Sequence, residues 1–450
     1  MTDDVTTADL TSTGHRPRWK RDTAVFLSGQ TVSMFGSMLV QYAIMWYLTI
    51  LTESGVVLML SALFGMLPQA IVSIFGGVWA DRLNRKRLII IADASIALTT
   101  LALAFFMLSG YSELWLIFLT LAIRSTGAGI QQPAVAALIP QLVPTPHLLR
   151  VNGIFQSISS AMMLVAPAAA GAIYAAAAEA WGPESAIVPI FFIDVVTAVL
   201  GIGFLLAIAV PTVRAVVDTG YFADLVKGVK YTFTHRFVRW LLALFAVIFI
   251  LTVAPSMLTP LMVVRSFGSD APADTSSDVW LLTVNELAFS VGMLLGGILI
   301  ATWGGLKNKV LMIVASSVLF GALTLALGLS TNVWVFFAFM FLVGLAVPFF
   351  STPATTLLQE RVEVEYQGRV FGFVGVVMAT AMPIGMVLFG PLADIVPVEW
   401  VLIGAGIATF VVVAIAVLVP SGRFALATGA EVPATPQEVG EAAEGVDANR

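Results

Sequence analysis

Long apolar runs separated by short polar breaks make up most of the 450-residue chain. Six runs precede a polar stretch at residues 211–236, and six more follow it. Each run is long enough for a helix that crosses the hydrocarbon core of a bilayer, which takes about 20 residues. The predicted spans are Thr23–Leu51, Val56–Ala80, Leu88–Ser109, Leu114–Ile139, Asn152–Ala176, Val188–Val210, Phe237–Val264, Val279–Thr302, Val310–Leu329, Val333–Leu358, Val370–Leu392 and Trp400–Val419. The pattern therefore predicts an all-α membrane protein with twelve transmembrane helices.

The distribution of charge supports this number of spans and orients them. Lys and Arg collect in the cytoplasmic loops of membrane proteins. If both termini are cytoplasmic, all 22 Lys and Arg residues except Arg124 and Arg265 fall in cytoplasmic segments. The predicted outer loops carry acidic residues instead, such as Glu53, Glu113 and Asp394. We therefore predict a multi-pass protein of a bacterial inner (plasma) membrane with cytoplasmic N and C termini.

Composition excludes several classes of function. Hydrophobic residues make up 59% of the chain and charged residues 11%, which leaves too little polar surface for a soluble enzyme. The net charge of −5 gives no reason to expect a nucleic-acid partner. The chain has no Cys and only three His, all outside the apolar runs, so we expect neither a metal site nor a cofactor. Because no phosphate-binding loop motif is present, the energy for any transport has to come from an ion gradient.

Short motifs recur at an offset of about 220 residues and indicate two copies of one six-helix unit. Gly76-Gly77 recurs as Gly296-Gly297, and Pro133-Ala134 recurs as Pro353-Ala354. We predict a cytoplasmic N-terminal tail at 1–22, six-helix bundles at 23–210 and 237–420, a cytoplasmic linker at 211–236 and a disordered C-terminal tail at 421–450. Apolar residues at helical spacing within 221–234 predict an amphipathic helix in the linker.

The turn after the second span carries a charged motif. Its residues Gly77, Asp81, Arg82, Arg85 and Lys86 resemble the Gly-x-x-x-Asp-Arg-x-Gly-Arg-Arg/Lys signature of the major facilitator superfamily. Asn84 stands where that family usually has Gly. The resemblance implies a gating motif on the cytoplasmic face. It also implies the major facilitator fold, in which two six-helix bundles enclose a substrate site near the membrane midplane.

Ionisable residues inside the spans are candidates for proton coupling. A carboxylate held in a low-dielectric interior can load and unload a proton, and Asp194 and Glu286 have no basic residue nearby in sequence. Arg124 should face a cavity or a carboxylate, and a purely structural ion pair is the alternative to a functional role. Exporters of the superfamily carry an Arg near this place that is thought to assist proton transfer. Asp93 lies close in sequence to the basic cluster at residues 85–87, so we expect a structural ion pair there.

Polar and Met residues recur at helical spacing along several spans and could line one central cavity. Packing between helices is the alternative for each of them. The candidates are Gln30, Met34, Ser37, Gln41, Gln131, Gln156, Ser290, Met293 and Met382.

Three further stretches narrow the resemblance to one branch of the superfamily. Residues 166–171, with Pro167 and Gly171, look like the Gly-Pro-x-x-x-Gly element of antiporters. The stretches that begin at Arg124 and at Glu286 look like those of the macrolide-efflux branch of drug:proton antiporters. The resemblance implies a monomeric, proton-coupled exporter that moves amphipathic drugs such as macrolides through the bilayer by alternating access. Export of a siderophore, bile acid or lysophospholipid, import of sugars or peptides, and a non-transporting sensor or scaffold stay open as alternatives.

Overall fold

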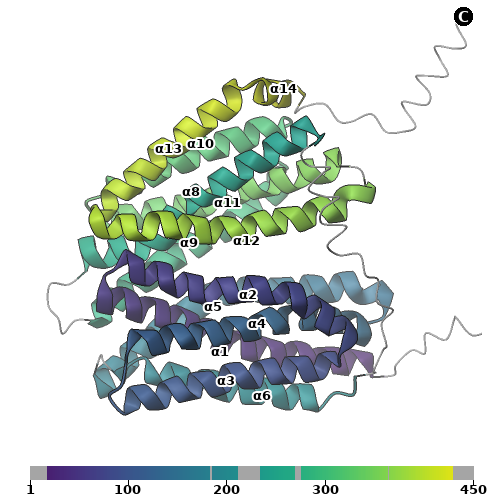
Figure 1. Ribbon diagram of the computed structural model, residues 1–450, viewed down its shortest axis with the longest axis vertical. Coiled ribbons are helices and arrows are strands. Elements are labelled where there is room, and N and C mark those ends of the chain that lie inside the picture. The colour runs from purple at the N-terminus through teal and green to yellow at the C-terminus, as the bar shows by residue number, and fades with distance from the viewer. Residues whose placement is uncertain (1–17, 183–184, 211–233, 269–274, 363, 429–450) are drawn as a thin grey trace, which may run out of the picture. The chain divides into compact units, whose positions relative to one another are not determined.

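The computed structural model describes residues 18–182, 185–210, 234–268, 275–362 and 364–428, and it contains only helices within these ranges (Figure 1). In the first half of the chain these are α1 (Trp19–Thr52), α2 (Gly55–Arg82), α3 (Arg85–Leu108), α4 (Leu114–Leu142), α5 (Leu148–Trp181) and α6 (Val188–Leu206). In the second half they are α8 (Arg236–Phe267), α9 (Thr275–Trp303), α10 (Lys309–Gly328), α11 (Val333–Arg361), α12 (Val364–Ile395), α13 (Val398–Leu418) and α14 (Pro420–Thr428).

Twelve of these helices have the length and hydropathy to cross a membrane, from α1 through α13. This confirms the all-α architecture and the predicted number of spans. The helices extend past the apolar runs at most of their ends, as in α8, which begins at Arg236 and ends at Phe267. The orientation of the termini stays a prediction.

Two asparagines begin equivalent helices in the two halves of the chain. The Asn84 side chain accepts a hydrogen bond from the backbone N–H of Arg87 at 3.2 Å and caps α3. In the same way, Asn308 accepts from the N–H of Leu311 at 3.0 Å and caps α10. An N-cap side chain satisfies an amide that the first helical turn leaves unpaired. Asn84 therefore has a structural task at the position where the superfamily signature usually has Gly.

The chain forms two compact units. The first unit takes in Met1–Val40, Pro68–Met163 and Val188–Val217, and the second takes in Gln41–Leu67, Leu164–Ile187 and Asp218–Arg450. The division runs through α1, α2 and α5. In the first unit α3 packs against both α4 and α6. An apolar core that includes Phe26, Ile89, Leu138 and Leu205 holds these helices together.

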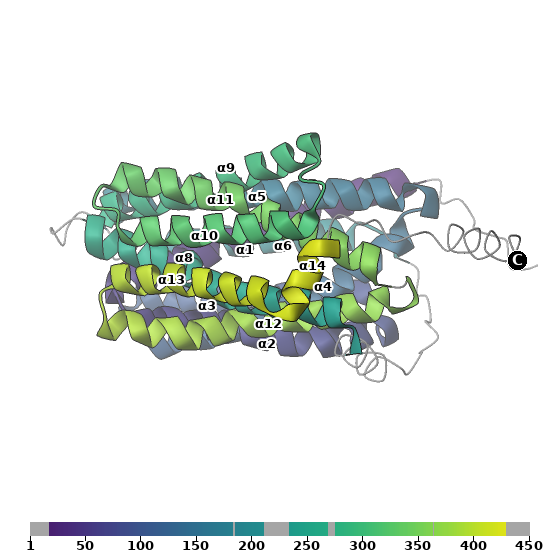
Figure 2. The ribbon, with the colours of Figure 1, turned by 90° about the horizontal axis from the view of Figure 1, so that it is seen from above.

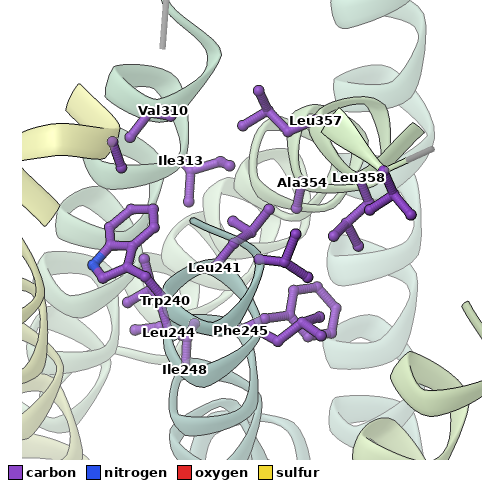
Figure 3. Close-up of a cluster of buried hydrophobic side chains, with 14 of the residues drawn as sticks. Trp240, Leu241, Leu244, Phe245, Ile248, Val310, Ile313, Ala354, Leu357 and Leu358 are labelled. Carbon is purple, nitrogen blue, oxygen red and sulfur yellow. The ribbon is translucent and has the colours of Figure 1, made fainter. Parts of the chain in front are cut away.

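The core of the second unit lies between α8, α10 and α11. Figure 3 shows Leu241 and Phe245 of α8 close to Ile313 of α10 and Leu357 of α11, and all four side chains are buried. The indole N–H of Trp240 donates to the Ala416 carbonyl of α13 at 2.9 Å, so this buried donor keeps a partner.

The chain beyond residue 420 begins with a helix, where composition led us to expect a disordered tail. Helix α14 lies at the end of α13 and contacts α8 and α10 (Figures 1 and 2). Ala425 is fully buried, and the Leu426 carbonyl accepts a hydrogen bond from the Asn308 amide at 2.9 Å. These contacts give a polar sequence enough burial to fold. The structure does not describe the tails at residues 1–17 and 429–450. It also does not describe the predicted amphipathic linker helix, except for its last residue, Thr234.

Candidate functional site

Arg124 of α4 and Asp194 of α6 form a buried ion pair in the first unit. The guanidinium Nη1 lies 2.5 Å from the carboxylate Oδ2, and the two side chains are 10% and 1% exposed. A charge buried without a partner costs several kcal/mol, so each residue makes the burial of the other tolerable. Asp194 is thus the carboxylate that Arg124 was expected to face.

Two hydroxyl residues complete the surroundings of this pair. The Thr100 hydroxyl donates to Asp194 Oδ2 at 3.0 Å and accepts from the Arg124 guanidinium. The Ser37 hydroxyl donates to Asp194 Oδ1 at 3.5 Å, and the Ser37 carbonyl accepts from Arg124 Nη2 at 3.4 Å. We call this set of Ser37, Thr100, Arg124 and Asp194, one residue from each of four helices, the arginine tier. Sequence reasoning missed Thr100.

A glycine permits this approach of α1 and α6. A Cβ atom on Gly36 would collide with the Thr197 hydroxyl and would lie 3.1 Å from Asp194 Oδ1. Any side chain at this position would therefore push α1 away from the carboxylate.

Asp93 of α3 was expected to pair with the basic cluster, and this expectation is wrong. The residue is 2% exposed and accepts a hydrogen bond from the Gln131 amide of α4, and the Ser33 side chain of α1 lies beside it. Its Oδ2 atom has no hydrogen-bond partner among the described residues. We call Ser33, Asp93 and Gln131 the aspartate tier.

The basic cluster is engaged elsewhere. Arg85 donates from Nε to the Ala80 carbonyl at 2.8 Å and from Nη1 to the Ala137 carbonyl at 2.7 Å. Lys86 donates to the Ile208 carbonyl at 2.7 Å, just past the end of α6. Carbonyls at helix ends lack intrahelical donors and attract cations, which explains the contacts with Ala80, in the last turn of α2, and with Ile208. Gly77, Asp81 and Arg82 fall in the last turns of α2, with side chains outside the described part of the structure.

Glu286 of α9 belongs to the second unit and is half-buried. Tyr42 of α1 lies close enough for its hydroxyl to interact electrostatically with the carboxylate. Within the described part of the chain, no basic side chain forms an ion pair with Glu286. The adjacent Asn285 is buried, and neither polar atom of its amide has a partner among the described residues. Sequence reasoning named Glu286 as a candidate and did not name Tyr42 or Asn285.

The antiporter-like element packs against the helix that carries Glu286. Pro167 lies inside α5, and Gly171 follows one turn later. A Cβ atom on Gly171 would collide with the Thr283 hydroxyl and would lie 3.1 Å from Thr283 Cβ. Thr283 precedes Glu286 by about one helical turn. Gly171 therefore sets how closely α5 approaches the Glu286 region of α9.

The other predicted cavity residues differ in their surroundings. In the first unit, Ser37 belongs to the arginine tier and Gln131 to the aspartate tier. Gln30 is buried and Gln156 is exposed. Met34 is half-buried, and its sulfur atom accepts a hydrogen bond from the Ser159 hydroxyl at 3.9 Å. In the second unit, Gln41 is exposed, Ser290 is buried, and Met293 and Met382 are half-buried. A hollow of about 320 Å³, which sequence reasoning missed, is lined by Ser351, Thr352, Thr355, Thr356 and Gln359 of α11. A shared cavity stays a prediction.

The turn between α1 and α2 is tied to α8 and α12 within the second unit. Asp394 Oδ1 accepts from the Gly55 N–H at 2.6 Å, and Oδ2 accepts from the Val56 N–H at 2.9 Å and the Ser54 hydroxyl at 2.7 Å. Arg265 Nη2 donates to Asp394 Oδ1 at 3.1 Å, and the same guanidinium binds the carbonyls of Ala393 and Glu53. We call this network the outer latch. The sequence indicates this network only through Arg265, a basic residue at the end of its span that is predicted to face away from the cytoplasm.

Comparisons with known proteins identify the family. The family model of the Major Facilitator Superfamily matches residues 23–308 and 273–443. The chain is 31% identical over 410 residues to Macrolide efflux protein A of Streptococcus pyogenes, covering 89% of this chain and 96% of the relative. It is 32% identical over 340 residues to Macrolide efflux protein A of Enterococcus faecalis, covering 74% of this chain and 99% of the relative.

Solved structures agree on the fold. A bacterial homologue of the human lysosomal transporter Spinster, inward-facing and unoccupied, matches with a TM-score of 0.66 and 13% identity over 94% of this chain and 100% of that chain. A bacterial homologue of the iron transporter ferroportin, also inward-facing, matches with a TM-score of 0.62 and 16% identity over 89% of this chain and 99% of that chain. With the family model, the curated relatives and twelve apolar helices in agreement, the chain belongs to the major facilitator superfamily and is a multi-pass membrane transporter of small substrates, not an enzyme.

Proposed function

We propose that the protein exports amphipathic drugs such as macrolides in exchange for protons, by alternating access across a bacterial plasma membrane. The observation that carries this proposal is the 31% identity, over 89% of this chain, to a relative named for macrolide efflux.

Glu286 is the residue that would exchange proton for cargo. Its carboxylate is half-buried and has no basic partner among the described residues. An isolated carboxylate in such a place has to take up a proton or attract a cation. A proton and a cargo amine would compete for it, and this competition is the chemistry of antiport. The proton gradient drives the exchange with about 2.3 kcal/mol per charge for each 100 mV of potential.

The test is drug extrusion from a bacterial strain that lacks its own efflux pumps. Cells that express the protein should accumulate less labelled macrolide than empty-vector cells, and an uncoupler should abolish the difference. Glu286→Gln should bind the drug and lose uncoupler-sensitive extrusion. Glu113→Gln is the matched control, because Glu113 lies at the start of α4 and makes no capping hydrogen bond with its side chain. Extrusion that persists at full rate without a gradient would refute proton coupling.

Export of an endogenous amphiphile is the second candidate, because the described neighbours of Glu286, Tyr42 and Asn285, would not distinguish a macrolide from another amphiphile. The same cells, loaded with a bile acid or a lysophospholipid, distinguish the two cargo classes, because only the extrusion of the true cargo should depend on the gradient.

We further propose that the transporter acts as a monomer. Light scattering of the purified protein in detergent measures its mass directly.

A further inference from the structure

The interior of the first unit holds more acid than base. The arginine tier contains one carboxylate, Asp194, and one guanidinium, Arg124, which neutralise each other at 2.5 Å. The aspartate tier contains a second carboxylate, Asp93, and only the neutral side chains of Ser33 and Gln131 beside it. With every group ionised, the two tiers together would carry one uncompensated negative charge.

The two tiers lie on the same helices, one or two turns apart. Ser33 precedes Ser37 on α1, Asp93 precedes Thr100 on α3, and Gln131 follows Arg124 on α4. Because α3 and α4 run in opposite directions, a residue earlier in α3 lies at the same level as a residue later in α4. The aspartate tier therefore lies nearer than the arginine tier to the end of the unit where α3 begins. Asp93 and Asp194 are close enough for their charges to repel each other.

Among the side chains that the structure describes, no neighbouring element supplies the missing positive charge. The helices that pack against α3 offer Arg124 and Asp194, and these are already paired. Arg85 and Lys86, at the start of α3, donate to helix-end carbonyls. Among the described residues, Asp93 Oδ2 has no hydrogen-bond partner, although the residue is 2% exposed. An isolated buried charge is far more costly than a neutral carboxylic acid in the same place.

We propose that Asp93 is a proton-binding site: it holds a proton on Oδ2 in the conformation described here and releases it during the transport cycle. A metal cation fits less well, because hard cations take about six oxygen ligands and this tier offers a carboxylate, a hydroxyl and an amide that uses its N–H. The proposal adds a second protonation site to the proposed exchange at Glu286. Only the release step depends on that proposed function.

The protonated acid can be observed directly in the resting transporter. Infrared difference spectroscopy of the full chain in lipid should show the carbonyl stretch of a buried carboxylic acid, and Asp93→Asn should lose this band. Asp22→Asn, at the start of α1, is the control and should retain it. Asp93→Glu should shift the band without deleting it, which keeps the test valid if the Asn variant folds poorly. An unchanged band in Asp93→Asn overturns the proposal.

A second measurement, the melting temperature as a function of pH, tests whether the folded protein holds the same proton. Because the proposed proton is held only in the folded state, wild-type stability should fall as the pH rises from the range in which Asp ionises in the unfolded chain up to the point where Asp93 ionises in the folded protein. Asp93→Asn should lose this decline, and its melting temperature should stay level over the same pH range. An equal decline in both proteins would place the titrating group elsewhere. Macrolide export that fails while the band is present would refute the proposed function and leave the protonation intact.

Discussion

The outer latch should hold the α1–α2 turn against α8 and α12, and Asp394 carries most of its contacts. The carboxylate caps the first turn of α2 through the Gly55 and Val56 amides and also binds Arg265. Loss of a cap costs about 1 kcal/mol. Loss of a negative charge at a helix N-terminus costs about 0.5 kcal/mol more.

The ion pair adds a smaller amount. Arg265 and Asp394 are 27% and 26% exposed, so water screens their attraction and the pair contributes about 0.5 kcal/mol. The three contributions together make about 2 kcal/mol, which is a factor of about 30 in an equilibrium constant. We therefore expect Asp394→Ala to raise the population in which the turn has separated by about 30-fold. Asp394→Asn keeps one acceptor, so about 1 kcal/mol and a fivefold rise are expected.

A thiol placed under the latch reports this opening. The chain has no Cys, so Met59→Cys gives a single reactive site without further changes. Met59 packs against α12, since a Cβ atom on Gly390 would lie 2.6 Å from Met59 Cβ. A membrane-impermeant maleimide added to intact cells should label this thiol about 30 times faster in the Asp394→Ala background, provided that the opened state is a minor one.

The matched control is Glu53→Gln, which removes a charge from the same turn. Only the backbone carbonyl of Glu53 takes part in the latch, so its side chain can change without loss of those contacts. The Glu53→Gln background should label at the wild-type rate. If Asp394→Ala labels no faster than Glu53→Gln, the latch does not govern the opening of this turn. Absence of labelling from outside in every background would refute the predicted orientation.

Two further predictions concern the buried contacts. Asp194→Asn should lower the free energy of unfolding in detergent by about 3–5 kcal/mol, because it leaves the Arg124 guanidinium uncompensated, whereas the double variant with Arg124→Gln should recover part of this loss. An additive double variant would contradict a direct pair. Gly171→Ala should lower the melting temperature because its Cβ collides with Thr283, at a cost of about 1–3 kcal/mol, and Thr283→Ala in the same chain should restore it.

The fold was largely predictable because lipid imposes a simple rule. A spanning helix has to be apolar over its whole length, so apolar runs count the spans directly. Helix ends were less predictable, since they depend on caps and on contacts outside the bilayer. Asn84 looked like a departure from a glycine motif, and only the hydrogen bond to the Arg87 amide explains it. Helix α14 was missed because its burial depends on Asn308 and α8, which are distant in sequence.

The candidate site was predictable in its residue types and not in its partners. Embedded ionisable residues stand out against an apolar background, so the sequence singles out Arg124, Asp194 and Glu286 as candidates. Pairing depends on the rotation of each helix about its axis, and proximity along the chain misled the assignment of Asp93. The nearest cations, at residues 85–87, lie on the same helix but at its polar end. The Gln131 amide, 38 residues away in sequence, supplies the actual contact.

Two basic residues, Arg124 and Arg265, do not follow the rule that Lys and Arg collect in cytoplasmic loops. Each of them forms an ion pair with a carboxylate of another helix. Lys and Arg in cytoplasmic loops are held there by the cost of moving charge across lipid. An Arg placed elsewhere needs a local partner to offset that cost. Arg124 has Asp194 in the interior of the first unit, and Arg265 has Asp394 at the α1–α2 turn. Since each pair joins helices that are far apart in sequence, a change in helix packing would have to break or rebuild it. Exceptions to the charge rule therefore indicate, in the sequence, basic residues that form ion pairs between helices distant along the chain.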